Sequence, residues 1–283
     1  AGGSSLDKLL KAWGLQVDTG KVVADRNLTM NLGGDEDPSQ RRPVWLALTP
    51  EEINSNDIAT AELENVWYFS GGAFTGTPVA GLTETVLLKS TTDSQLVDGM
   101  LANVSGDNIL KDFKPSGTAY ALAVRLNGKF KTAFPDGEPQ EKKDDAKDSQ
   151  KKPDASLKET KENNSVVLIG DADMIYDGFT LRRVNSPFGQ MAMAMNGNLN
   201  FAQNLVEQLS GDNNLIAVRS RTVLERPFTR IRKIEAEADA RYMDKEKELQ
   251  ESYDKTVARL NELQQQKNPN QRYILSPEQQ AEI

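Results

Sequence analysis

The sequence predicts an α/β fold, built in three layers around a largely parallel sheet, with an inserted hairpin and a long C-terminal helix. Three observations lead to this fold class. Short apolar runs of strand length alternate with helical or turn-rich segments, which is typical of βα units. Two runs, residues 44–48 and 166–169, are continuously apolar, as expected for strands that helices cover on both faces. Residues 229–267 contain neither Gly nor Pro, which favours one long helix.

Eight strands are expected from apolar and β-branched runs that turn residues bound on either side. In chain order they cover residues 21–25, 43–49, 66–70, 85–89, 119–126, 128–134, 165–170 and 215–220. The fifth and sixth flank Asn127-Gly128, a dipeptide that favours the positive φ angles of a two-residue type I′ turn. These two strands are therefore predicted to form a tight hairpin.

Two amphipathic helices are predicted between the strands. The first covers residues 5–13, ends at Gly14 and repeats apolar residues at spacings of three and four: Leu6, Leu9, Leu10 and Trp13. The second ends at Gly211 and repeats the same spacing: Leu199, Ala202, Leu205, Val206 and Leu209. Each apolar face is expected to pack on the sheet.

Composition divides the chain into four parts. Residues 1–134 and 163–228 form the α/β domain. Between them, residues 135–162 hold nine acidic residues, seven lysines and three prolines, which predicts a flexible charged loop. Residues 229–267 are the long helix, and residues 268–283 are a C-terminal tail. The start Ala-Gly-Gly-Ser-Ser suggests a piece excised from a longer protein.

The long helix carries a thin apolar stripe that Lys245 interrupts. A heptad seam would continue through that position, so the stripe does not establish a coiled coil. The sequence leaves three interpretations open: a self-associating coiled coil, an exposed stalk, and a helix that docks on a partner.

Two residue types are missing, and their absence excludes much catalytic chemistry. With no histidine and no cysteine, the chain cannot form a Ser-His-Asp or Cys-His triad, a Cys or His metal site, or a disulfide. Carboxylate, lysine or tyrosine acid–base chemistry and oxygen-ligated Mg²⁺ or Ca²⁺ remain. A net charge of −8 argues against nucleic acid as a partner. No cofactor is predicted.

Two loops at strand ends are candidate sites, and each also has a structural interpretation. Asp171 and Asp173 follow the run 165–170, where open α/β sheets place metal or phosphate chemistry. They could hold Mg²⁺, contact a ligand, or only cap and turn the loop. Ser70 and Gly71 follow the run at 66–69 and resemble an oxyanion-type loop. Without histidine or a Gly-x-Ser-x-Gly pattern, a tight glycine turn is favoured there.

The longest uncharged stretch, residues 184–206, spans 23 residues. Its amides, proline and glycines argue against a membrane-spanning helix. Within it, Met191, Met193 and Met195 alternate with alanines, so a strand would place all three on one face. Such a face suits either a packed core or an adaptable binding surface.

Several motifs also occur in an order that resembles one transport family. They cover residues 6–15, 21–25, 119–134, 166–173 and 196–204, followed by the long charged helix. Together they resemble the auxiliary component of bacterial ABC-type transport systems related to gliding motility, the GldG-like family. The resemblance implies a fold similar to class I glutamine amidotransferases and flavodoxins, placed on the periplasmic side of the inner membrane. It implies no catalytic residues, in keeping with the absence of Cys and His. It also implies that first strands of the α/β domain are missing from this chain, and that the tail at 268–283 leads towards a membrane segment that this chain lacks.

The leading hypothesis is a non-enzymatic, periplasm-facing binding subunit of an ABC-type transporter complex. Its partners would be the ABC permease and ATPase subunits, and its anchor in the bacterial inner membrane would lie in segments outside this chain. Ser70, Gly71, Asp171 and Asp173 would then contact a ligand or partner. The main alternative is a divalent-metal-dependent hydrolase or transferase that uses Asp171 and Asp173. A third is a coiled-coil scaffold, and self-association as a homo-oligomer stays open.

Overall fold

The computed structural model describes residues 6–31, 41–102, 106–135, 137, 157–186, 189–211 and 229–265. The chain divides into two compact units, Ala1–Thr229 and Arg230–Ile283. Among the described residues the second unit holds only helix α7 (Thr229–Gln265), apart from its first residue. The long helix expected from the sequence is thereby confirmed. None of the described helices combines the length and the apolar character that crossing a membrane would need.

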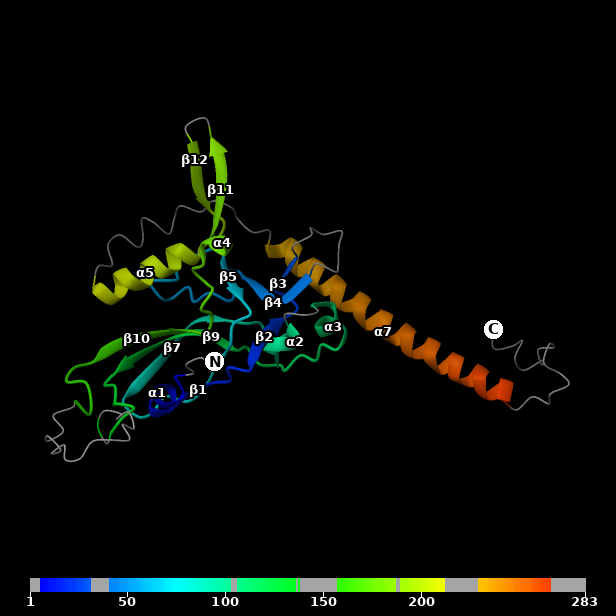
Figure 1. Cartoon of the computed structure of the whole chain (residues 1–283), viewed down its shortest axis with the longest axis horizontal. Helices are drawn as coiled ribbons and strands as arrows, with labels where there is room; N and C mark the ends of the chain where they lie inside the picture. Colours follow the sequence, from blue (N-terminus) through cyan, green and yellow to red (C-terminus); the bar gives the residue numbers. More distant parts are fainter. Residues whose placement is uncertain are drawn as a thin grey trace, which may run out of the picture. The chain divides into compact units, whose positions relative to one another are not determined.

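The first unit is built from sheets (Figure 1) whose strand pairs, among the described residues, are all antiparallel. The largest sheet has the order β1 (Leu15–Val17), β6 (Phe74–Gly76), β9 (Ala121–Gly128) and β10 (Asn164–Ile169), with β7 (Leu82–Lys89) also paired to β9. A second sheet has the order β3 (Thr29–Asn31), β4 (Arg41–Leu48) and β5 (Val66–Phe69). Two further pairs are β2 (Lys21–Asp25) with β8 (Ser94–Asp98), and β11 (Leu181–Ser186) with β12 (Gly189–Ala194).

The prediction of a three-layer, largely parallel α/β fold, similar to amidotransferases and flavodoxins, was wrong. Six of the predicted runs do form strands close to the expected residues, namely β2, β4, β5, β7, β9 and β10, but their pairing is antiparallel. The apolar run in β4 is explained without flanking helices. Leu46 and Leu48 face the main core, whereas Trp45 packs against Phe69 of the neighbouring strand at 5.4 Å between ring centroids.

The tight hairpin predicted at Asn127-Gly128 was also wrong. β9 pairs with β7 and with β10, so Gly128 lies opposite both Leu82 and Asn164. The strand predicted at 128–134 is reduced to a single bridge between Lys131 and Glu159. Gly128 has a φ of 140°, and a Cβ there would lie 2.1 Å from the Gly81 carbonyl oxygen. Glycine is therefore needed for close strand approach, not for a type I′ turn.

Both amphipathic helices are present, as α1 (Asp7–Ala12) and α5 (Asn198–Ser210). Gly211 ends α5 in the left-handed conformation, with a φ of 87°. Three shorter helices are α2 (Gly99–Ala102), α3 (Gly106–Lys111) and α4 (Asp177–Thr180). The strand predicted at 215–220, most of the predicted loop at 135–162 and the tail at 268–283 lie outside the described residues. The proposed domain boundaries therefore stay a prediction.

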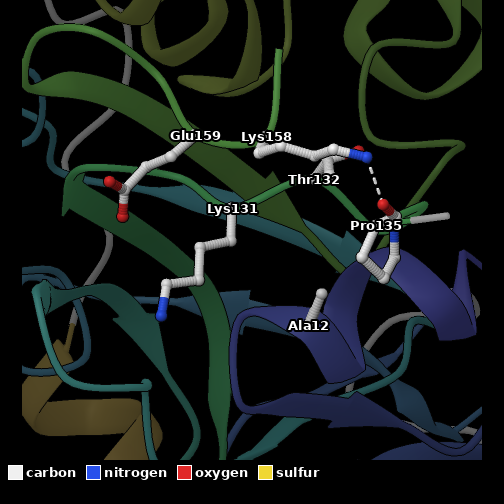
Figure 2. Close-up of a pocket in the computed structure, with 6 residues that line it drawn as sticks. All are labelled: Ala12, Lys131, Thr132, Pro135, Lys158 and Glu159. Carbon is white, nitrogen blue, oxygen red and sulfur yellow. Dashed lines mark hydrogen bonds between the residues drawn. The ribbon is translucent and has the colours of Figure 1, made fainter. Parts of the chain in front are cut away.

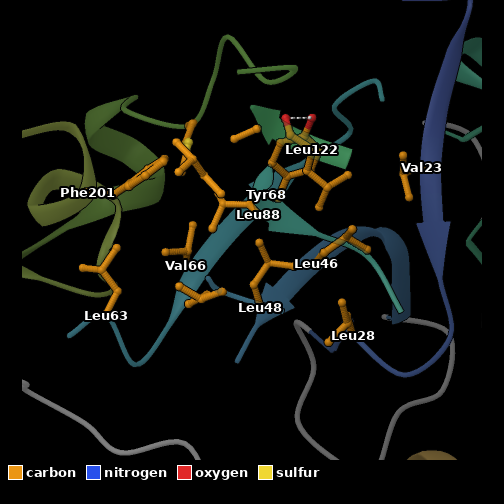
Figure 3. Close-up of a cluster of buried hydrophobic side chains, with 14 of the residues drawn as sticks. Val23, Leu28, Leu46, Leu48, Leu63, Val66, Tyr68, Leu88, Leu122 and Phe201 are labelled. Carbon is orange, nitrogen blue, oxygen red and sulfur yellow. Dashed lines mark hydrogen bonds between the residues drawn. The ribbon is translucent and has the colours of Figure 1, made fainter. Parts of the chain in front are cut away.

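The main core joins the three-stranded sheet to β7, β9 and α5 (Figure 3). Its fully buried side chains include Leu46, Tyr68, Leu88, Leu122 and Phe201. In Figure 3 the dashed line from the Tyr68 hydroxyl marks its bond to the Leu122 carbonyl. Burying a tyrosine here brings a polar group to the end of β5, where one candidate loop begins.

Candidate functional site

The structure brings the two candidate loops together. Residues 70–72 follow β5 and residues 170–173 follow β10. The Gly72 N–H donates to the Gly170 carbonyl at 2.9 Å, so backbone hydrogen bonding joins the loops directly. We call residues 70–72 and 170–173 the loop junction. All four residues singled out by the sequence, Ser70, Gly71, Asp171 and Asp173, belong to it.

Asp171 is buried and holds the loop junction closed. Its Oδ2 accepts the Phe69 N–H at 2.6 Å, and its Oδ1 accepts the Asp173 N–H at 2.8 Å. Burial raises the pKa of the Asp171 carboxyl to about 6, against the opposing effect of these backbone donors. Because both carboxylate oxygens accept backbone hydrogen bonds, Asp171 acts as a clamp between β5 and the loop after β10.

Ser70 is held in a backbone conformation that a non-glycine residue adopts rarely. Its φ is 47°, in the left-handed region. The Ser70 N–H donates to the Val44 carbonyl at 2.7 Å, and the Gly71 carbonyl accepts the Val23 N–H at 2.9 Å. The turn is thus fixed to both β4 and β2, and these contacts over-determine the strained position of Ser70.

Tyr68 lies against both loops and explains their glycines. Its hydroxyl donates to the Gly72 carbonyl at 2.5 Å. A Cβ at Gly71 would meet the Tyr68 ring at 2.4 Å, and one at Gly170 would meet the Tyr68 hydroxyl at 2.4 Å. Burial, and secondly the charge of Asp171, raises the pKa of Tyr68 well above its usual value. At Gly71 the packing therefore supports the structural interpretation, a tight glycine turn.

Ile175 and Tyr176 follow the loop junction in the chain and form its exposed apolar rim. Phe69 stacks on Phe179 with 4.3 Å between ring centroids, and the Tyr176 ring meets Phe179 edge-on at 5.4 Å. Ile175 and Tyr176 are 57% and 61% exposed. Asp173 is exposed beside them. The rim therefore presents two apolar side chains and one carboxylate to the surroundings, a combination suited to binding.

Asn198 is a site residue that the sequence analysis missed. It is fully buried at the start of α5. Its Oδ1 accepts the Trp67 N–H at 2.8 Å, and its Nδ2 donates to the Trp67 and Met174 carbonyls at 2.8 and 2.7 Å. The side chain thus makes the two backbone hydrogen bonds to Trp67 that a strand beside β5 would otherwise make. It also fixes Met174, in the segment after Asp173. A signal was present, since buried Asn198 and Asn204 fall at the same helical spacing as Phe201.

No group of three or more carboxylates placed to hold a metal ion occurs among the described residues. A surface hollow of about 410 Å³ occurs elsewhere, and the sequence analysis did not anticipate it (Figure 2). Its lining residues are Ala12, Lys131, Thr132, Pro135, Lys158 and Glu159. Figure 2 shows the Lys158 ammonium donating to the Pro135 carbonyl. None of these residues belongs to the loop junction.

The methionines of the uncharged stretch are on the surface in part. Met191 and Met193 lie on one face of β12 and are 55% and 39% exposed. Met195 follows the end of the strand and is half-buried. For the first two methionines the structure therefore supports the surface interpretation rather than the core one.

Comparison with known proteins adds a family to this geometry. A family model described as ABC-type uncharacterized transport system matches residues 1–205. No curated protein and no solved structure matches the chain. The matched residues include both loops of the junction, α1 and most of α5. The chain therefore belongs to the family of auxiliary components of ABC-type transport systems.

Proposed function

We propose that this chain is a non-enzymatic, periplasm-facing subunit that binds a partner or an exported substrate for an ABC-type transporter. The family membership supports a role in an ABC transport system. The order of the sequence motifs supports the gliding-motility-related type within that family. The contact surface is the loop junction with its exposed rim.

The observation that carries the proposal is the contrast between Asp171 and its neighbours. Both oxygens of Asp171 are occupied by backbone donors, and the carboxylate is buried. Ile175 and Tyr176 nearby are exposed. The buried groups thus stabilise the loops, and the side chains that reach solvent offer apolar contact beside the Asp173 charge. That division of roles supports recognition more than proton transfer.

The proposed partners are the permease and ATPase subunits of the same transport system. Segments of the protein outside this chain would anchor the unit in the bacterial inner membrane. A partner that contacts the rim would cover Ile175 and Tyr176 and would carry a cationic group opposite Asp173.

Co-purification with the transporter from native membranes tests the proposal. Ile175→Ser and Tyr176→Ala remove the apolar rim without touching the buried clamp. Both should lower the recovered permease and ATPase at least about tenfold, because loss of a central apolar contact costs on the order of 2 kcal/mol. Leu157→Ser is the matched control, since Leu157 is also 57% exposed but lies outside the junction and its rim. Equal recovery for all variants would contradict the proposal.

The metal-dependent enzyme is distinguished by the double variant Asp171→Asn with Asp173→Asn. Under the binding role, Asp173→Asn alone should leave the fold intact and weaken only partner recovery. Calorimetric titration of the wild-type chain with Mg²⁺ and with Ca²⁺ should give no binding heat. Metal binding that disappears in the double variant, together with metal-dependent turnover by the wild-type chain, would establish the enzyme instead.

A further inference from the structure

The two-stranded ribbon of β11 and β12 leaves one strand edge unguarded. Figure 1 shows the ribbon extending away from the other sheets of the first unit. Its register is continuous from Leu181 opposite Ala194 to Ser186 opposite Gly189, without a bulge. Within the part of the chain that the structure describes, no third strand pairs with either edge. An isolated two-stranded ribbon is only marginally stable in water, so a further strand would stabilise it.

The hydrogen-bond pattern shows which backbone groups point outwards. The Met195 N–H donates to the Thr180 carbonyl at 2.8 Å, so Thr180 and Met195 form a hydrogen-bonded pair. The next pair along the ribbon is Leu181 with Ala194. Hydrogen-bonded and non-hydrogen-bonded pairs alternate along an antiparallel ladder. Gln190, Ala192 and Ala194 therefore direct their N–H and C=O groups away from β11. These three residues lie symmetrically about Ala192.

The charged side chains of the ribbon all lie on β11. The ribbon carries Arg182 and Arg183 on β11 and no acidic residue, whereas β12 has no charged residue at all. Natural edge strands are commonly protected by charges, prolines or bulges. β11 has such protection and β12 has none. A second β12 could approach this edge without bringing like charges together.

We propose that β12 pairs antiparallel with β12 of a second copy of this chain, about a two-fold axis at Ala192. In this register Ala192 faces its own counterpart, and Gln190 faces Ala194 of the other copy. All the outward groups of both strands are then used, which gives six hydrogen bonds by the alternation above. A shift of the axis to Met191 or Met193 leaves some of these groups unpaired. The central register is therefore the self-complementary one.

The exposed methionines become the side-chain contact of this pairing. Met191 of one copy lies opposite Met193 of the other, twice by symmetry. These are non-hydrogen-bonded pairs across the new seam, in which side chains approach most closely. Methionine side chains adapt readily to such contacts. The arginines on β11 stay on the outer strands of the resulting four-stranded sheet.

The expected strength follows from the small size of the contact. Protein interfaces hold roughly one hydrogen bond per 100–200 Å², so six bonds correspond to about 600–1,200 Å². That area lies at the lower end of specific interfaces. The dimer should therefore have a dissociation constant on the order of micromolar or weaker. Sedimentation equilibrium of the full chain over a range of concentrations should show a monomer–dimer equilibrium.

Cysteine trapping tests the register directly, because the chain contains no cysteine of its own. Ala192→Cys places two thiols across the axis, with Cα atoms about 5.5 Å apart, which a disulfide can bridge. Mild oxidation should convert this variant to a covalent dimer. The matched control is Asn185→Cys on β11. Its two copies would be separated by about three strand spacings across the sheet, roughly 14 Å, and by about four residues along the strands, so this variant should remain monomeric after oxidation.

Proline substitution tests the role of the edge. Ala192→Pro removes an outward N–H and no hydrogen bond of the ribbon itself, so it should weaken dimerisation by roughly tenfold or more. Asn185→Pro makes the same change on the outward edge of β11 and should leave the dimer unchanged. Far-ultraviolet circular dichroism checks that both variants remain folded.

Three results would overturn the proposal. The first is a wild-type chain that stays monomeric up to hundreds of micromolar. The second is a dimer that Ala192→Pro and Asn185→Pro affect equally. The third is equal cross-linking of the two cysteine variants, and this outcome does not depend on how well the proline variants fold.

Discussion

At the scale of single residues, two buried carboxylates, Asp25 and Asp171, each hold several backbone N–H groups in place. Asp25 accepts the Asn27 and Leu28 N–H groups on one oxygen and the Thr91 N–H on the other. Asp171 does the same for Phe69 and Asp173. Burial raises the pKa of each carboxyl from 3.8 to about 6. In both cases the backbone hydrogen bonds offset the cost of burying a charged carboxylate and join segments that are far apart in the chain.

This arrangement predicts an unusual pH dependence of stability. The folded-state pKa of both carboxyls lies above the ordinary value, so between about pH 4 and pH 6 the folded chain binds more protons than the unfolded chain. Their contribution to the free energy of unfolding is therefore greatest below about pH 4 and is lost as pH rises through about 6. The loss is on the order of 2–3 kcal/mol per group.

Urea unfolding at pH 5, 6 and 7 measures this effect. Asp25→Asn should reduce the fall in stability between pH 5 and pH 7, and Glu62→Gln, on an exposed carboxyl, should not. If the stability of the wild-type chain and that of Asp25→Asn changed equally between pH 5 and pH 7, the pKa of Asp25 would not be raised in the folded chain.

Part of the candidate site could be predicted from the sequence. Asp171, Asp173, Ser70 and Gly71 were found because acidic and glycine residues directly after apolar runs are conspicuous. The role of Asp171 as a clamp was not predictable, since its donor, the Phe69 N–H, is 102 positions away in the chain. Asn198 was missed because its partners on β5 are equally remote.

At the scale of elements, local pattern predicts strands but not their pairing. The apolar run of β4 looked like a strand covered by helices, yet its outer face is covered by the rings around Trp45. Asn127-Gly128 has hairpin composition, but both edges of β9 are already taken by β7 and β10. Long-range competition for strand edges decided the topology, and no local window of sequence contains it.

The turn after β5 gives a sharp test of element packing. Gly71→Ala would place a Cβ 2.4 Å from the Tyr68 ring, which is itself fully buried and cannot move away easily. The expected loss is about 1–3 kcal/mol of unfolding free energy, measured by chemical denaturation. Gly99→Ala is the control, because a Cβ there meets its neighbours at an ordinary 3.5 Å. Similar losses for the two variants would contradict the packing argument.

At the scale of the whole molecule, the sheet-rich unit has a buried apolar core, whereas the described side chains of the charged helix α7 are mostly exposed. Lys245, which interrupts the apolar stripe of α7, forms an exposed ion pair with Glu248 at 2.8 Å. Tyr242, Leu249 and Tyr253 are more than 60% exposed. Exposed pairs of this kind contribute little stability. Among its described residues, α7 therefore does not itself establish a coiled coil.

A shortened chain that ends at Arg226 separates the two sources of self-association. If β12 drives dimerisation, the shortened chain should keep both the dissociation constant of the full chain and its unfolding midpoint. Light scattering and thermal unfolding of the two chains measure these quantities. A dimer that is lost with α7 would instead support the coiled-coil scaffold.

The aromatic cluster beside Asp171 provides an optical reporter. Of the three tryptophans, Trp45 and Trp67 both lie within 6.2 Å of Phe69, between ring centroids, whereas Trp13 packs on Phe130 in a separate cluster. Intrinsic fluorescence from two indoles should therefore shift in colour or intensity when a molecule settles on the neighbouring loops, over a steady background from the third. Titrations can follow occupancy in this way without any attached dye.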